Sequence, residues 1–365
     1  MQSAQSPLHM VIQEPVLHQF IAFLAAKKAE QEASPGSHVR IELPRDFIIR
    51  VREAFRLNII QGERNLHTLA HLLSSILLDG KFELHCNVIG ALPDSSQRPF
   101  LIRERIERDT LLNVTDIDLG NHMLDHFRYR KDQEWVPLEL SANFVEYLPC
   151  APVRSGVNRL TSRVKAEEEL WNKVTDELFG VDELVVKDKH FRQFSKFIKD
   201  IFGIKIVCED EASCLKVHKR LEELTFDELD RRRLEMYGLA DEAVDIDFHP
   251  VDEDKPSALH FLETKDYLTC HEEQMKKTGW RALKSVVLWS ERLFEIQVQP
   301  LSNYYLELDH MSGPSHRSFK LRRDAMRAEL SERIPLYGFY RDLLRMLFME
   351  DELSFECEQA SVIIT

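Results

Sequence analysis

A chain of 365 residues with 44% hydrophobic and 30% charged residues has the composition of a folded globular protein and the length of two ordinary domains. Its net charge of −14 argues against a surface that binds nucleic acid by bulk electrostatics, so any polyanion site would be local. The six cysteines form no CxxC pair, and we see neither an apolar signal segment nor a run long enough to span a bilayer. We therefore expect a cytoplasmic protein with reduced thiols, no zinc site and no membrane partner.

The first half of the chain predicts a mixture of helices and strands. "EPVLHQFIAFLAAKKAEQEA" has the periodicity of an amphipathic helix beginning at Pro15, and "SPGS" ends it. "HVRIELP" alternates like a short strand, and helices are expected over about Arg45–Leu57 and Leu66–Leu78. The later segments predict a strand in "KFELHCNVIGAL", a helix in "RPFLIRERIERDTLLNV" and a strand in "LELSANFVEYLP".

A linker is predicted at "PCAPVRSGVN", which is rich in proline, glycine and serine. We place a domain boundary there, near residue 155. Residues 1–154 would form a separate α/β module of unknown role, residues 155–330 a second domain, and residues 331–365 a C-terminal helical extension.

The second domain opens with helices and a buried strand. "RLTSRVKAEEELWNKVTDELFG" predicts a long helix, or a loop that leads into one, ending at Gly180. The next segments predict a helix in "HFRQFSKFIKD", a buried strand in "IFGIKIVCED" and a helix in "EASCLKVHKRLEEL".

An acidic insert, "DEAVDIDFHPVDEDKP", is expected to be a solvated loop. Strands follow in "SALHFLETKDYLT", "WRALKSVVLWS" and "RLFEIQVQ", and then helices in "NYYLELDHMSGPSHRSFKLRRDAMRAELSERI" and "LYGFYRDLLRMLFME". The last helix either packs on the domain or offers a face for a partner or self-association. The fold class is α+β, with a mixed sheet flanked by helices.

The strand "LFEIQVQP" carries the first candidate for chemistry. Its alternation puts Glu295, Gln297 and Gln299 on one face and only apolar side chains on the other. One interpretation is a half-exposed strand with its polar face in solvent. The other is that Glu295 shares a site with a second carboxylate.

Asp200 is the candidate for that second carboxylate, because it precedes the buried strand "IFGIKIV". Mg²⁺ prefers oxygen ligands and takes one or two carboxylates from protein, leaving its other positions to phosphates and water. Cations recur around the two acids, as a nucleotide polyphosphate site requires. They are Arg163, Lys165, Lys173, Lys205, Lys265, Lys276, Lys277 and Lys284.

The segments "SRVKAEEELWNKV", "KDIFGIKIVCEDEASCLKV", "KDYLTCHEEQMKKTGWRALKS" and "FEIQVQP" resemble, in order, the motifs of the RelA/SpoT-type (p)ppGpp synthetase domain. The resemblance covers roughly Arg159 to Lys320. It implies a nucleotidyltransferase-like mixed sheet and transfer of pyrophosphate from ATP to the 3′-hydroxyl of a guanine nucleotide, which is alarmone synthesis. The hydrolase of longer family members requires a His-Asp dipeptide, which this chain lacks.

The resemblance also implies roles for particular residues. Asp200 and Glu295 would be the catalytic, magnesium-binding acids. Lys265, Lys276, Trp280 and Lys284 would lie on the acceptor side, with Trp280 where the family has a base-stacking tyrosine. The ATP phosphates would be bound by Arg163, Lys165, Lys173 and Lys205.

The chain departs from the family pattern at five positions. Lys205 replaces an arginine, Trp280 a tyrosine, Ala282 a serine, Lys284 a histidine and Gln299 a basic residue. Most of these departures fall on the acceptor side. Two alternatives therefore stay open: the same chemistry on adenine nucleotides or on the 3′ end of tRNA, as in a toxin, and a degenerate domain that binds nucleotide as a sensor. Self-association and an antitoxin partner also stay open.

Overall fold

The computed structural model describes residues 14–34, 38–91, 100–125, 127–131, 133–164, 167–179, 201–225, 229, 258–269, 280–311, 325, 327–334, 336–349, 356–357 and 360–365. The chain forms two compact units, each assembled from segments that are far apart in sequence. Unit 1 comprises Met1–Gln61, Lys165–Ile201 and Arg317–Thr365, and unit 2 comprises Gly62–Val164 and Phe202–His316. None of the described helices is both long and apolar enough to cross a membrane.

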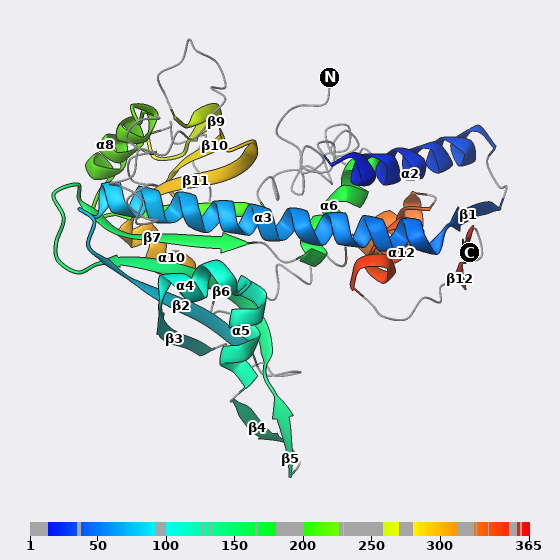
Figure 1. The fold of residues 1–365 in the computed structure, drawn as a ribbon, viewed down its shortest axis with the longest axis horizontal. Coiled ribbons are helices and arrows are strands. Elements are labelled where there is room, and N and C mark those ends of the chain that lie inside the picture. Colours follow the sequence, from blue (N-terminus) through cyan, green and yellow to red (C-terminus); the bar gives the residue numbers. More distant parts are fainter. Residues whose placement is uncertain are drawn as a thin grey trace, which may run out of the picture. The chain divides into compact units, whose positions relative to one another are not determined.

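Unit 2 is built on an eight-stranded mixed sheet (Figure 1). All neighbouring strands pair antiparallel except β8 and β11, which are parallel. The prediction of an α+β protein with a large mixed sheet is confirmed. In spatial order the strands are β3 (Phe100–Ile106), β2 (Phe82–Ala91), β6 (Glu139–Pro149), β7 (Val157–Val164), β8 (Phe202–Cys208), β11 (Arg292–Pro300), β10 (Leu283–Trp289) and β9 (His260–Asp266).

Two helices pack against β8 and β11 from opposite faces of this sheet (Figure 1). Helix α8 (Glu211–Glu222) begins where Asp210 accepts a hydrogen bond from the backbone N–H of Ser213, and it places Val217 and Leu221 in the core. Its His218 contacts Ser285, whose side chain points to the opposite face from that of the neighbouring Lys284. Helix α10 (Leu301–Met311) contacts Lys205 and Gln299 on the other face. The apolar face therefore lies under α8, and the polar face under α10.

The sheet runs through the predicted linker, because β6 before it pairs with β7 after it. A division near residue 155 therefore does not coincide with the two units. Two predicted helices were wrong: "FLIRERI" is strand β3, followed by the short helix α4 (Arg108–Asn113), and "RLTSRV" lies in strand β7. The helices predicted over 45–57 and 66–78 are one helix, α3 (Arg45–Leu77).

Three smaller elements complete unit 2. Helix α5 (Asp116–Asp125) packs on β2 and β6. Strands β4 (Arg128–Lys131) and β5 (Glu134–Pro137) form a separate antiparallel hairpin with an exposed Trp135.

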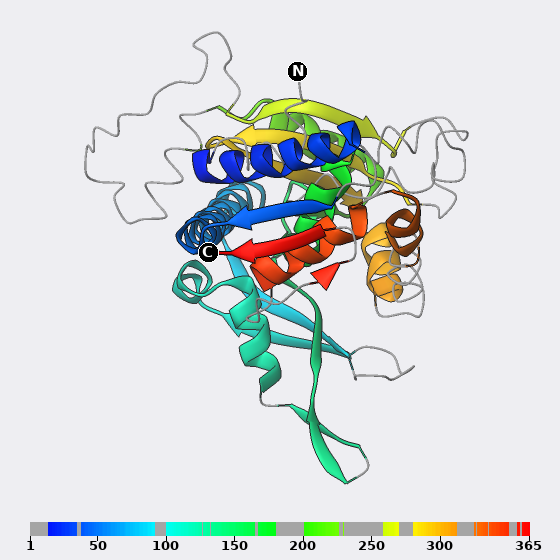
Figure 2. The same cartoon turned by 90° about the vertical axis from the view of Figure 1, so that its right-hand side faces the viewer.

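Unit 1 combines a small sheet with helices. Figure 2 shows β1 (Val39–Leu43) beside β13 (Ala360–Ile364), and the two pair in parallel. Strand β12 (Glu356–Cys357) pairs with β13 on its other side. The predictions had no strand at this end of the chain. The described helices of unit 1 include α2 (Pro15–Ala33), α6 (Glu167–Leu178), α12 (Tyr337–Met349) and the first part of α3.

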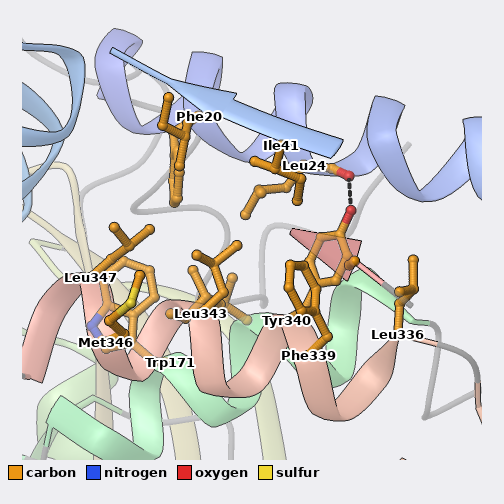
Figure 3. Close-up of a cluster of buried hydrophobic side chains, with 14 of the residues drawn as sticks. Phe20, Leu24, Ile41, Trp171, Leu336, Phe339, Tyr340, Leu343, Met346 and Leu347 are labelled. Carbon is orange, nitrogen blue, oxygen red and sulfur yellow. Dashed lines mark hydrogen bonds between the residues drawn. The ribbon is translucent and has the colours of Figure 1, made fainter. Parts of the chain in front are cut away.

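The core of unit 1 lies among α2, β1, α6 and α12 (Figure 3). Leu343 and Leu347 of α12 are fully buried, as are Phe20 of α2 and Ile41 of β1. The Tyr340 hydroxyl donates a 2.9 Å hydrogen bond to the carbonyl of Leu24, which satisfies its polar atom inside the core. The last helix is therefore buried within unit 1, against segments from both predicted domains, rather than on the surface of the second domain alone.

His71, on α3 within unit 2, should make the folded protein less stable in acid. Burial and the positive charge of Arg108 lower the pKa of His71 to about 4, and its ring lies 5.0 Å from that of Phe82. Between pH 6.5 and pH 4, His71 is protonated in the unfolded chain but stays neutral in the folded chain. The free energy of unfolding therefore falls as the pH falls toward 4. Between pH 7 and pH 5 this residue alone should reduce the free energy of unfolding by about 2 kcal/mol.

The variant His71→Phe keeps an aromatic ring and removes the titrating group. Its free energy of unfolding, measured in urea at pH 7 and pH 5, should differ less between the two pH values than that of the parent. A variant with the parent's full pH dependence would contradict the assignment.

Candidate functional site

A row of polar side chains crosses the face of the sheet that carries Glu295. In the strand register Gln297 pairs with Lys205 on one side and with Lys284 on the other, and Lys284 in turn pairs with Lys265. Paired residues point to the same face, so these three lysines and Gln297 form one row, which we call the basic row. Three of the cations named in the sequence analysis thus lie on the same face of the sheet as Glu295.

Glu295 lies next to the basic row and is almost completely buried, with 3% of its surface exposed. Its carboxylate forms an ion pair with Lys284 and accepts a hydrogen bond from the side-chain amide of Gln297. Gln299, on the same face, is fully buried as well, so the interpretation of a half-exposed strand with its polar face in solvent is wrong. A buried carboxylate requires such partners, because burying an unpaired charge is very unfavourable.

A gap in the layer of side chains lies beside Glu295. Gly203 of β8 pairs with Glu295 of β11 and with Arg163 of β7, so the side chains of those two residues flank a position that has none. A Cβ atom at Gly203 would meet only one atom of the described residues within 4 Å, the carbonyl oxygen of Arg163 at 3.8 Å. Two strand spacings, about 10 Å, thus separate the backbones of Arg163 and Glu295, and Gly203 contributes no side chain between them.

These features partly fit a magnesium ion. Glu295 supplies one hard oxygen donor beside an open position, which is the ligand type that Mg²⁺ takes from proteins. A metal at this carboxylate would compete with Lys284, whose partly exposed side chain is long enough to move aside. Asp200, the second acid of the prediction, lies outside the described residues. The described residues hold no cluster of three or more acidic, histidine or cysteine side chains arranged for a metal.

A second carboxylate, the partly buried Glu307 of α10, lies at the end of the basic row. It accepts hydrogen bonds from the ammonium of Lys205 at 2.6 Å, the indole N–H of Trp280 at 2.8 Å and the amide of Gln299 at 3.0 Å. Burial acts to raise the pKa of Glu307, but the charge of Lys205 and these hydrogen bonds lower it overall. Glu307 is therefore ionised at neutral pH.

A third carboxylate, Glu146 of β6, anchors the same helix farther along the sheet. Its oxygens lie 2.6 Å from the guanidinium of Arg159 and 3.3 Å from that of Arg103, and it accepts a 2.9 Å hydrogen bond from the hydroxyl of Tyr304. Arg159 also stacks on the Tyr304 ring, with 4.8 Å to its centroid. This network holds α10, and with it Glu307, against the sheet.

The structure places the predicted site residues unevenly. Arg163, Lys205, Lys265, Lys284 and Glu295 lie on one face of the sheet, with Trp280 just before β10. Lys173 is on α6 in unit 1, whereas Arg163 is on strand β7, so the prediction that they share a helix was wrong. The side chain of Lys173 and the residues Asp200, Lys165, Lys276 and Lys277 lie outside the described part.

The predictions missed Glu307 and Glu146. A signal for Glu307 exists in the sequence: Asn303, Tyr304 and Glu307 recur at the spacing of one helix face. Asn303 and Tyr304 are buried, and Glu307 lies on the same face of the helix, so its carboxylate is expected at the same interface with the sheet.

Glu222, His218 and Ser285 lie in the order of a hydrolytic triad on the other face of the sheet. His218 contacts Ser285 at 3.0 Å and Glu222 at 3.6 Å. Ser285 is only 1% exposed and also contacts the hydroxyl of Thr264 at 3.0 Å. A nucleophile must reach its substrate, so this set is part of the core.

No protein-family model and no curated protein matches this chain. Several solved structures are similar to about half of it, among them the following three. The small alarmone synthetase 1 from Bacillus subtilis is 14% identical with a TM-score of 0.21, over 53% of this chain and 74% of that one. The same synthetase bound to its product pppGpp is 15% identical with a TM-score of 0.25, over 53% and 76% of the two chains. The third, smu.1046c from Streptococcus mutans UA159, is 15% identical with a TM-score of 0.19, over 52% and 82%.

This chain is thus similar to small alarmone synthetases, at low identity and over about half its length. TM-scores below 0.5 do not assign an activity. The case for one comes from the residues of the polar face.

Proposed function

We propose that this protein is a pyrophosphokinase that transfers the β,γ-pyrophosphate of ATP to the 3′-hydroxyl of a guanine nucleotide. The observation that carries the proposal is the buried carboxylate of Glu295 beside the gap at Gly203, opposite Arg163 and next to the basic row. The motifs that resemble the RelA/SpoT-type synthetase domain contribute all of these residues. Their convergence on one face is what a shared active site requires.

In the proposed reaction the 3′-oxygen of the acceptor attacks the β-phosphorus of ATP. The bond from that phosphorus to the oxygen bridging it to the α-phosphate breaks, AMP leaves, and the hydroxyl proton is lost to solvent or to a carboxylate. Magnesium held by Glu295 and Asp200 would offset the charge of the phosphates. Arg163 and Lys165 would bind the phosphates of ATP through charge-assisted hydrogen bonds and hold them in line with the acceptor oxygen.

The acceptor side would use Lys265, Lys276 and the ring of Trp280. A base stacks on an indole face regardless of its identity, so selectivity for guanine must come from other groups. The ammonium of Lys205 forms a 2.6 Å ion pair with the carboxylate of Glu307. We therefore propose that Lys205 stabilises Glu307 rather than binding the phosphates of ATP. Lys284 is already paired with Glu295 and is available to a phosphate only if that pair opens.

This last contact favours a second candidate function. If the ion pair between Lys284 and Glu295 stays closed, a metal is excluded and the domain would bind nucleotide without transfer, as a sensor. The third candidate, transfer to an adenine nucleotide or to the 3′ end of tRNA, follows from the cation at Lys284, which suits an acceptor rich in phosphate.

One assay separates these functions. The protein would be incubated with magnesium and ATP labelled on the γ-phosphate, with GDP, GTP, ADP, ATP or tRNA as acceptor. We expect label on a guanine nucleotide. Label on adenine nucleotides or tRNA would identify the alternative acceptor, and ATP binding without transfer to any acceptor would identify a sensor. Absence of both binding and transfer would contradict the proposal.

A further inference from the structure

Glu307 brings together three of the five positions at which this chain departs from the synthetase pattern. Its carboxylate receives the ammonium of Lys205, the amide of Gln299 and the indole N–H of Trp280. These donors come from β8, from the end of β11 and from the segment before β10. One acceptor thus accounts for three replacements that look unrelated in the sequence.

The bond to Trp280 sets the orientation of its ring. An indole has one hydrogen-bond donor, and here that donor points at Glu307. The ring is also held at its edge by Tyr267, with the centroids 5.6 Å apart and the ring planes at 60°. A tyrosine at this position would carry its only side-chain donor at the tip of the ring, whereas the indole N–H lies on the ring edge, so a bond to the carboxylate would hold the two rings differently.

Glu307 is itself held from several directions. Lys205 neutralises its charge, and α10 is held against the sheet by the bond from Tyr304 to Glu146 and by the bond from the Asn303 amide to the carbonyl of Arg281. Arg281 directly follows Trp280, so the helix holds both the side chain of Trp280 and the backbone beside it. A support of this kind limits the ring to one orientation.

We propose that Glu307 is a positioning residue that holds the indole of Trp280 as the stacking platform for the base of the acceptor nucleotide. This inference rests on the proposed function. In this proposal Lys205 stabilises the charge of Glu307. The orientation of the indole should then depend on a carboxylate or amide at position 307 and not on a cation near the base.

The first measurement needs no nucleotide. The indole N–H signal of Trp280 in a ¹⁵N–¹H NMR spectrum, assigned with Trp280→Phe, should be protected from exchange with solvent in the parent. It should remain protected in Glu307→Gln, whose amide oxygen can accept the same bond, and lose protection in Glu307→Ala. Glu211→Ala is the matched control, because it removes a carboxylate that pairs with the neighbouring Arg281 and leaves the indole bond in place.

The second measurement is binding of GDP and ADP to the same variants. Glu307→Ala should weaken binding of the preferred diphosphate by about tenfold or more, the range expected for loss of one stacked base. Glu307→Gln and Glu211→Ala should bind like the parent. In a Trp280→Phe background, which keeps a ring but no N–H, Glu307→Ala should cause no additional loss, because the effect passes through the indole.

The outcomes distinguish the two proposals. If the parent binds neither diphosphate, the proposed function fails and this inference fails with it. If the parent binds one of them and Glu307→Ala exposes the indole N–H yet binds as tightly, only the positioning role is overturned. An equal loss in the Trp280→Phe background would also overturn it, because Glu307 would then act by another route.

Discussion

Glu295→Gln should remove pyrophosphate transfer while the protein stays folded. The substitution keeps the size and approximate shape of a side chain that is 3% exposed, and it removes the charge that offsets Lys284 and that would hold a metal together with Asp200. Loss of a group that acts directly on the reacting atoms typically reduces turnover by about 10²–10⁴-fold. Turnover would be measured with labelled ATP and saturating magnesium, and folding by circular dichroism and urea unfolding.

Glu222→Gln is the control for this experiment, because that carboxylate is on α8, against the opposite face of the sheet, and should not affect turnover. Addition of a magnesium chelator to the parent should reproduce the loss seen in the variant. A Glu295→Gln protein with the parent's turnover would show that this carboxylate is not part of the active site.

Glu146→Ala should give the largest loss of stability among substitutions on the polar face. Glu146 is 2% exposed and is the shared partner of Arg159, Arg103 and Tyr304. Its removal leaves the partly buried guanidinium of Arg159 without its closest counter-charge, and breaking a buried pair costs about 3–5 kcal/mol. Urea unfolding followed by circular dichroism would measure the change.

Glu104→Ala is the matched control, because this glutamate lies exposed on strand β3, which β2 separates from the strand that carries Glu146. It should leave the free energy of unfolding nearly unchanged, within about 0.5 kcal/mol. If the two variants were equally stable, the Glu146 network would not be what holds α10 on the sheet.

Elements with one clear hydrophobic pattern could be predicted from the sequence. Helix α2 and strands β1, β8 and β11 match their expected positions closely because each buries a regular stripe of apolar side chains. Strand β7 could not be recognised in this way. Thr161 and Ser162 are both buried, so its two faces look alike in polarity, and the charged run that follows favours a helix.

Helix α3 was divided in the prediction because its middle is polar and contains Gly62. The structure gives that glycine a packing role: a Cβ atom there would lie 2.1 Å from the ring of Phe202, so only glycine allows the helix and the strand to approach so closely. A glycine inside a helical pattern thus marks a close contact here and not a break.

The residues of the candidate site that lie on strands could be selected from the sequence, because alternation along a strand fixes which side chains share a face. Glu295 and its neighbouring lysines follow from the register of β8, β11, β10 and β9, and a resemblance in motif order was enough to select them. Glu307 was missed because its role depends on how α10 docks, which no local pattern specifies. The roles of all these site residues remain predictions, and for Asp200, Lys165 and Lys276 their positions do as well.

The pairing of β1 with β13 bears on the order in which the chain folds during synthesis. Unit 2 is complete once residue 316 has left the ribosome, whereas β1, made near the start, has its sheet partner only at Ala360–Ile364. The apolar side chains of β1, including Ile41 and Leu43, therefore lack this partner strand until all of unit 2 and the C-terminal segment have been synthesised. Unit 1 contains the first segments of the chain but can be completed only after unit 2. During translation, the unpaired edge of β1 and the helices near it are therefore the surfaces that we expect a chaperone to bind.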